Sequence, residues 1–117
     1  MKFEDLEVWK RSAALSAEIY LTLTQLKDFG FKDQITRSSL SIPSNIAKGV
    51  ERGSDNEVIR FCAIASGSCG ELRTQIYIGM KIGYISADQG KPWIQETIEI
   101  SAMLTGFIKH RQGNAHE

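Results

Sequence analysis

The stretch VIRFCAIASGSCGELRTQIYIGMKIG, residues 58–83, carries an apolar or small residue at alternating steps of four and three positions. The members of this repeat are Val58, Cys62, Ala65, Cys69, Leu72, Ile76, Gly79 and Gly83. Such steps place successive residues on one face of an α-helix, which has 3.6 residues per turn. The pattern therefore predicts one long helix over residues 58–83. Because its contact face is built largely from small side chains, a neighbouring helix can approach it closely.

Four glycines fall within this predicted helix: Gly67, Gly70, Gly79 and Gly83. A glycine inside a helix costs about 1 kcal/mol relative to alanine, so a sequence that keeps four of them is expected to gain tight packing in return. Gly67 and Gly70 lie off the repeating face. Their position predicts a close approach on a second side of the helix.

The start of the same helix has its own signal. Ser54–Glu57 reads SDNE, the form of a capping box, in which Ser54 accepts from the Glu57 amide while the Glu57 side chain reaches back. Directly before it, a periodic segment over residues 32–52 ends at Gly53. The short interval between the two segments predicts a tight turn between antiparallel helices.

Two more amphipathic segments complete the chain. Residues 5–26 carry a wide apolar stripe, which KDFGFKD (27–33) interrupts with a glycine. The last segment starts near Ser86 or at Pro92 and ends in KHRQG (109–113), whose cations suit the negative end of a helix dipole. No window alternates as a strand would. We therefore expect an all-α, up-down-up-down four-helix bundle that forms one domain over residues 1–117, with a short polar tail.

Composition bounds the function. Fourteen basic and fourteen acidic residues cancel, and the pI is near 6.7, so any basic patch must be local. The opening MKFEDLEVWK is charged throughout and is not a secretory signal. No apolar run approaches the roughly 18 residues of a membrane span. These features predict a cytoplasmic protein with no membrane partner.

The two cysteines are expected to be packing residues. Cys62 and Cys69 lie seven apart, which on a helix separates them by about 10 Å along the axis. A disulfide cannot close beyond a Cα separation of about 7 Å, and two thiols fall short of the four ligands of a zinc site. We expect no metal and no cofactor.

The segment RSSLSIPSNIAKGVERG, residues 37–53, places a proline inside a helical pattern. Pro43 removes the backbone hydrogen bond to the Ser39 carbonyl and is expected to bend the helix there. Leu40 and Ala47 form a small apolar flank beside the main apolar face. A bent helix with an extra apolar flank could follow a curved surface such as a neighbouring subunit.

The region QITRSSLSIPSNIAKGVERGSDNEVIRFCAIASGSCGELRTQIYIGMKIGYI, residues 34–85, resembles the signature region of four-helix-bundle proteins encoded in intervening sequences of bacterial 23S ribosomal RNA genes. The run F-x-D-L-x-V-W, Phe3–Trp9, is similar to the opening of the same family. The resemblance implies a left-handed bundle assembled as a homopentameric ring. A related branch, the accessory proteins of diversity-generating retroelements, is a similar pentamer that binds nucleic acid and a reverse transcriptase. This chain departs from the family at Lys48, where glutamate is usual, and at Arg73, and both changes add positive charge.

These observations favour a non-catalytic, homo-oligomeric protein that binds RNA, DNA or a ribonucleoprotein through a basic helix face. The candidate residues are Arg37, Lys48 and Arg52 on one helix and Arg60 on the next, with Arg73 as a further candidate. Their cationic groups would neutralise phosphates without reading sequence. The same residues also fit a solvated polar face, with Asp33 and Glu51 at its edges diluting the charge. The alternative is a protein-interaction scaffold, for example for a polymerase-type partner, without direct contact to nucleic acid.

An enzyme is the third class, and the sequence argues against it. Arg111 and His116 have four residues between them, a spacing that superficially resembles the ribonuclease motif of another helical family. Here the pair is expected in a polar tail, where nothing would hold it in a reactive geometry. His110 has no carboxylate or nucleophile at a fixed spacing, and no serine has a base partner. We therefore expect no catalytic residue.

Overall fold

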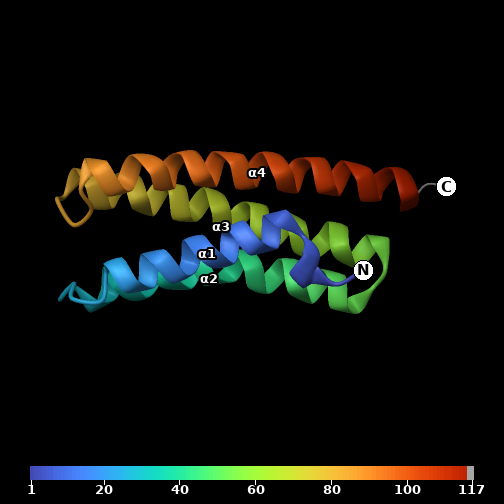
Figure 1. Ribbon diagram of the computed structural model, residues 1–117, viewed down its shortest axis with the longest axis horizontal. Helices are drawn as coiled ribbons and strands as arrows, with labels where there is room; N and C mark the ends of the chain where they lie inside the picture. Colours follow the sequence, from blue (N-terminus) through green and yellow to red (C-terminus); the bar gives the residue numbers. More distant parts are fainter. Residues whose placement is uncertain (116–117) are drawn as a thin grey trace.

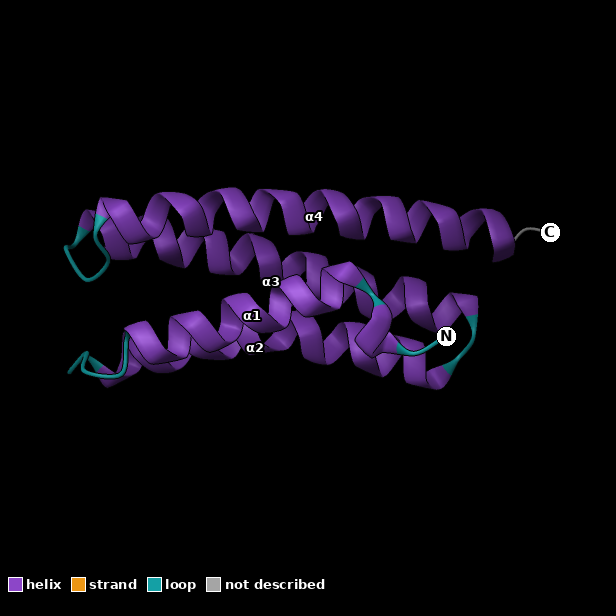
Figure 2. Ribbon diagram, viewed as in Figure 1, coloured by secondary structure: helices purple, strands orange, loops and turns teal. Residues whose placement is uncertain are grey.

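The computed structural model describes residues 1–115, which form a bundle measuring 50 × 21 × 20 Å. A 3₁₀ turn, η1 (Phe3–Asp5), precedes four α-helices. These helices are α1 (Glu7–Thr22), α2 (Phe29–Arg52), α3 (Asp55–Lys81) and α4 (Ala87–Ala115). Figure 1 shows them running alternately up and down, and Figure 2 shows that the loops lie at the two ends of the bundle. The predicted all-α, four-helix architecture is confirmed.

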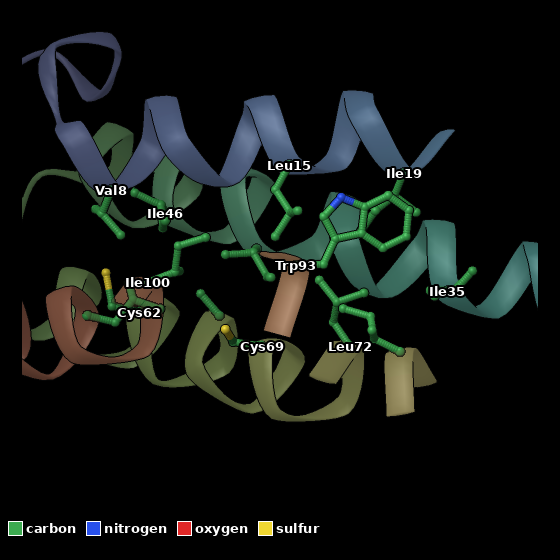
Figure 3. Close-up of a cluster of buried hydrophobic side chains, with 14 of the residues drawn as sticks. Val8, Leu15, Ile19, Ile35, Ile46, Cys62, Cys69, Leu72, Trp93 and Ile100 are labelled. Carbon is green, nitrogen blue, oxygen red and sulfur yellow. The ribbon is translucent and has the colours of Figure 1, made fainter. Parts of the chain in front are cut away.

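The packing is strongest along the chain. The helix α3 contacts both α2 and α4, α1 packs on α2, and α1 closes more loosely on α4. One apolar cluster fills the interior, and Figure 3 shows side chains from all four helices meeting in it, among them Leu15, Ile46, Cys69 and Trp93. Burial of this cluster removes apolar surface from water and supplies the main driving force for folding.

The repeat on α3 forms the central part of this core. The following members are all buried: Val58, Cys62, Ala65, Cys69, Leu72, Ile76 and Gly79. Gly83 is an exception, because α3 ends at Lys81 and Gly83 takes a left-handed conformation with φ of 82°. The Gly83 amide donates to the Met80 carbonyl and the Tyr84 amide to the Gly79 carbonyl, which is a Schellman stop. The expectation that Gly83 lies inside the helix was wrong.

The predicted close approaches divide into two groups. A Cβ added at Gly79 would meet Ile85 at 2.5 Å and Phe31 at 3.0 Å, so this glycine is required for packing. Gly67 and Gly70 are exposed, and a Cβ at either would enter open space. The expected approach on a second side of α3 is therefore not made within the subunit.

The helix bounds differ from the sequence expectations at several ends. The first helix stops at Thr22, whereas α2 already begins at Phe29 because the Asp28 carboxylate caps the Phe31 amide. Of the two predicted starts for α4, the earlier is correct, since the Ser86 hydroxyl accepts from the Gln89 amide. Likewise α4 continues through the predicted polar tail to Ala115.

Pro43 does not end α2, which continues as one helix from Phe29 to Arg52. Its ring is buried against the bundle. The apolar face predicted for this helix is confirmed, because Ile35, Ile42 and Ile46 are fully buried. Leu40, on the predicted flank, is 47% exposed.

Candidate nucleic-acid interface

Three of the four predicted basic residues gather around one aromatic ring. Lys48 and Arg52 come from the last turns of α2, and Arg60 comes from the second turn of α3. The Lys48 Nζ lies 5.6 Å from the centroid of the Phe61 ring, and the guanidinium carbons of Arg52 and Arg60 lie 5.1 and 5.0 Å from it. All three distances are within the range of a cation–π interaction. We call Lys48, Arg52, Arg60 and the Phe61 ring the cationic cluster.

The turn between α2 and α3 creates this arrangement. Gly53 ends α2 with φ of 86°, and the Ser54 hydroxyl caps α3 by accepting from the Glu57 amide at 3.2 Å. The chain therefore reverses within two residues, which brings Arg52 beside the first turns of α3. The cluster lies at the end of the bundle where α2 turns into α3 (Figure 1).

Glu57 partly neutralises the cluster. Its two carboxylate oxygens lie 3.4 Å from Arg52 Nη1 and 3.4 Å from Arg60 Nη1. The first half of the predicted capping box is confirmed, but the second half was wrong, because the Glu57 carboxylate contacts arginines and not the Ser54 amide. Within the part of the chain that the structure describes, Glu57 is the one carboxylate paired with these three cations, and Lys48 forms no ion pair.

Arg37 is not part of the cluster. It precedes Lys48 by 11 residues on α2, about 16 Å along a helix axis. It is 77% exposed and its Nε donates to Asp33, four residues earlier, at 3.0 Å. Arg37 therefore lies apart from the cationic cluster along α2, and Arg60 joins Lys48 and Arg52 there. The use of Arg37, Lys48 and Arg52 as one binding surface stays a prediction.

Arg73 is hydrogen-bonded to α4 within the subunit. Its Nε donates to the Thr97 hydroxyl at 2.8 Å, and its Nη2 donates to the Thr97 carbonyl at 3.1 Å and to the Ser101 hydroxyl at 3.0 Å. These bonds join α3 to α4. Arg73 is partly buried, and its Nε and Nη2 donors are used within the subunit, so the structure gives this side chain a packing role. Its assignment as a nucleic-acid contact stays a prediction.

A second surface feature is an open groove between α1 and α2, with a volume of about 620 Å³. We call it the α1/α2 groove. Its lining is Phe3, Trp9, Ala13, Ser16, Ala17, Tyr20, Leu21, Leu40, Pro43, Ser44 and Ala47. None of these residues is charged. The flank of Leu40 and Ala47 was predicted, whereas the aromatic half from η1 and α1 was missed. Trp9 and Tyr20 belong to the predicted apolar stripe of the first helix, but Phe3 joins them only because η1 folds back before α1.

Arg111 and the two cysteines have structural roles. Arg111 donates to Asp55 Oδ1 at 2.8 Å and lies over the Phe107 ring, while His116 lies outside the described residues. Burial raises the pKa of the Cys62 thiol to about 11, so this thiol stays protonated near neutral pH. Cys62 and Cys69 are buried and unpaired, as expected.

Over residues 1–115 the structure contains no group of three histidine, cysteine or carboxylate side chains that could hold a metal ion. Over the same range, none of the helices has the combination of length and apolar character needed to cross a lipid bilayer.

The fold and its surfaces define a class of small four-helix proteins made of two antiparallel helical hairpins, with a basic cluster at the turn that joins them. Residues 4–106 match the family described as 23S rRNA-intervening sequence protein, and the chain belongs to that family. The resemblance found in the sequence is confirmed to this extent. The relation to the accessory proteins of diversity-generating retroelements stays a prediction.

A solved structure supports the fold. The chain is similar to a protein of unknown function from the S23 ribosomal protein family of Bacteroides thetaiotaomicron VPI-5482, whose crystal structure was determined at 1.70 Å resolution. The TM-score is 0.81 at 26% sequence identity, and the match covers 87% of this chain and 98% of the other. A comparison with curated proteins gave no match.

Proposed function

We propose that this protein binds RNA through the cationic cluster and catalyses no reaction. The observation that carries the proposal is the convergence of Lys48, Arg52 and Arg60 on Phe61 with one paired carboxylate. Guanidinium and ammonium groups bind phosphate oxygens, and their charge is not cancelled locally even though the whole chain is neutral. Membership of a family described by a ribosomal RNA intervening sequence supports RNA as the nucleic acid.

The geometry favours contacts to the phosphate backbone over contacts to bases. Arg52 and Arg60 are 54% and 64% exposed, so their outer N–H groups are available, while the Phe61 ring beneath them is buried and cannot stack on a base. Binding of this kind is insensitive to sequence and weakens with salt, because neutralised phosphates release counterions.

The test replaces all three cations with glutamine, in Lys48→Gln/Arg52→Gln/Arg60→Gln. We expect binding of a single-stranded RNA of mixed sequence at 50 mM salt to be lost. For any residual binding, the slope of log affinity against log salt concentration should become shallower by about 2, the value for three lost phosphate contacts. The measurement is fluorescence anisotropy at several salt concentrations.

The matched control removes three exposed lysines elsewhere on the bundle, in Lys81→Gln/Lys91→Gln/Lys109→Gln. This variant has the same net charge as the first, so it should retain RNA if binding depends on the cluster. Equal losses in the two variants, or no RNA binding by the natural protein at 50 mM salt, would overturn the proposal.

We also propose that the protein is a homo-oligomer, with five subunits as the family resemblance implies, and that the α1/α2 groove is occupied by a second copy. The groove is apolar and uncharged. A different surface of the subunit, the outer side of α3, also exposes apolar groups: Ile64 and Ile78 are 44% and 48% exposed, and a Cβ added at the exposed Gly67 would meet nothing within 4 Å. Two unlike complementary faces on one chain are what a closed head-to-tail ring requires.

The same groove favours one alternative function, a scaffold that binds a protein partner. Salt dependence distinguishes the two functions. The affinity of an apolar protein contact changes little between 50 and 200 mM salt, whereas the affinity of phosphate contacts falls strongly. A groove that stays open in the purified protein would support the scaffold.

A further inference from the structure

A small polar pocket lies between α2 and α3, apart from the cationic cluster and from the α1/α2 groove. Its volume is about 330 Å³. Its lining consists of Gln34, Arg37, Ser38, Ser41, Glu71 and Gln75. Every one of these side chains can form hydrogen bonds, in contrast to the apolar lining of the groove. We call this feature the α2/α3 pocket.

One lining atom lacks the partner that its burial requires. The side-chain oxygen Oε1 of Gln75 is buried and has no hydrogen-bond partner among the described residues. Buried polar atoms in proteins are nearly always hydrogen-bonded to protein or to water, so this acceptor is open to a donor from water or from a ligand.

Glu71 supplies a second acceptor beside the first. Its Oε1 accepts from the buried Ser38 hydroxyl at 2.7 Å, which fixes the carboxylate against α2. The other oxygen, Oε2, accepts no hydrogen bond from the described residues, and Glu71 forms no ion pair with them. Glu71 and Gln75 are four residues apart on α3, so they are neighbours on one side of the helix.

Ser41 forms a wall of the pocket whose hydroxyl already has partners. The Ser41 hydroxyl is hydrogen-bonded to the Ser68 hydroxyl at 2.8 Å and accepts from the Asn45 amide at 2.9 Å. At the rim, Arg37 uses its Nε for Asp33, and its terminal N–H groups donate to none of the described residues. The pocket therefore offers the buried oxygen of Gln75, the free carboxylate oxygen of the exposed Glu71 beside it, and the terminal N–H groups of Arg37 at its mouth.

We infer that the α2/α3 pocket binds a guanine base, with the attached phosphate on Arg37; the inference rests on the proposed RNA binding and adds a site with base preference to it. Guanine presents two adjacent N–H donors, N1–H and N2–H, which match an acceptor pair containing one carboxylate. Adenine and cytosine present one amino group and uracil one imino N–H, so each leaves an acceptor unpaired. Of the two acceptors, the Gln75 oxygen is buried, so a base that leaves it unpaired is penalised, which is what makes such sites discriminate.

The experiment titrates the full chain with the 5′-monophosphates of guanosine, inosine, adenosine, cytidine and uridine, and follows the Gln75 side-chain amide resonance by NMR. Guanosine monophosphate should shift this resonance and bind at least 10-fold more tightly than the adenosine, cytidine and uridine nucleotides. Inosine monophosphate lacks the N2 amine, so its affinity should lie between that of guanosine monophosphate and those of the other three nucleotides.

Two variants test the acceptors separately. Glu71→Gln and Gln75→Leu should each weaken guanosine monophosphate binding by about 10-fold while circular dichroism shows unchanged helicity. Glu51→Gln is the matched control, because it removes an exposed carboxylate of α2 outside the pocket and should leave the affinity unchanged. Equal affinity for the five nucleotides, or an unmoved Gln75 resonance, would overturn the inference.

A second arm distinguishes guanine in RNA from a free nucleotide, and it separates this inference from the proposed function. An oligouridine with one central guanosine should bind more tightly than the all-uridine strand, and Glu71→Gln should remove the difference while leaving all-uridine binding in place. If that difference is absent while both strands bind, the guanine site is refuted and the RNA-binding proposal survives. If neither strand binds but guanosine monophosphate does, the pocket serves a free nucleotide and the RNA-binding proposal fails.

Discussion

At the scale of single residues, Gly49 is the clearest case of a position that the packing determines. It lies on α2 opposite the start of α3, and an added Cβ would meet the Phe61 Cβ at 3.0 Å and the Glu57 carbonyl and Val58 Cα at 3.2 Å. Two of these three neighbours are backbone atoms, which cannot move aside as a flexible side chain can.

We expect Gly49→Ala to lower the free energy of unfolding by about 1–3 kcal/mol, the usual cost of overpacking, in spite of the better helix propensity of alanine. The matched control is Gly106→Ala on α4, where an added Cβ meets nothing within 4 Å. That variant should gain up to about 1 kcal/mol. Urea unfolding of both variants checks the prediction, and a stabilised Gly49→Ala would contradict it.

The sequence predicted which residues would be buried better than it predicted the partners of the charged side chains. The repeat from Val58 to Gly79 was correct because burial follows from periodicity along one helix. The environment of Arg73 could not be predicted, because Thr97 and Ser101 approach it from a helix more than 20 residues later. The Glu57 carboxylate was likewise assigned to a local cap. Of its two partners, Arg60 lies three residues later on the same helix, whereas Arg52 reaches it only across the turn.

At the scale of helices, one ionic contact holds the weakest pair of neighbours together. Arg11 on α1 contacts two carboxylates of α4: its Nε donates to Glu96 at 2.9 Å and its Nη2 to Glu99 at 2.7 Å. The hydrogen bonds from Arg11 and, to a smaller extent, from Gln95 hold the pKa of Glu99 below its ordinary value of 4.5. A lowered pKa in the folded state means that the ionised carboxylate stabilises the fold.

This contact predicts how stability depends on pH. The contribution is complete above the unfolded pKa, near 4.5, and is lost as the pH falls through the lower folded pKa, so the urea midpoint should decrease below about pH 4.5. Arg11→Met should lower the midpoint at pH 7 and make its decrease with acid shallower.

Arg37→Met is the control for the pH series. It removes an arginine whose pair with Asp33 is highly exposed and lies within one helix, so it should cost at most about 1 kcal/mol. An Arg11→Met variant with the same acid limb as the natural protein would show that the α1–α4 contact contributes nothing through Glu99.

The ends of the helices show where local signals suffice. Ser54 and Gly53 were recognised because a cap and a left-handed stop need only adjacent residues. The start of α2 at Phe29 was missed because Gly30, its second residue, was interpreted as a helix break. The Asp28 cap immediately before the helix was the stronger signal. The continuation of α4 to Ala115 was missed for the reverse reason, since Gly113 is tolerated inside the helix.

At the scale of the whole molecule, three surfaces of different chemistry lie on one small bundle. The cationic cluster lies at the α2–α3 turn, the polar pocket lies along α2 and α3, and the apolar groove lies between α1 and α2. The helix α2 contributes to all three. The sequence indicated its basic and apolar sides, but not the aromatic residues of η1 and α1 that complete the groove, because their contribution depends on how the N-terminal turn folds back.

The groove leads to the prediction at this scale, which concerns assembly. Light scattering of the natural protein should give one species of about five times the 13.1 kDa subunit mass. Leu40→Glu should convert it to monomers with unchanged helicity, because a carboxylate in the apolar groove cannot be buried without a partner. Ile98→Glu is the control: Ile98 is 43% exposed on α4 and lies outside the groove, so its charge should leave the assembly intact. A monomeric natural protein, or an oligomer that tolerates Leu40→Glu, would refute the assignment of the groove to a second copy, and the exposed face of α3 would then need another partner.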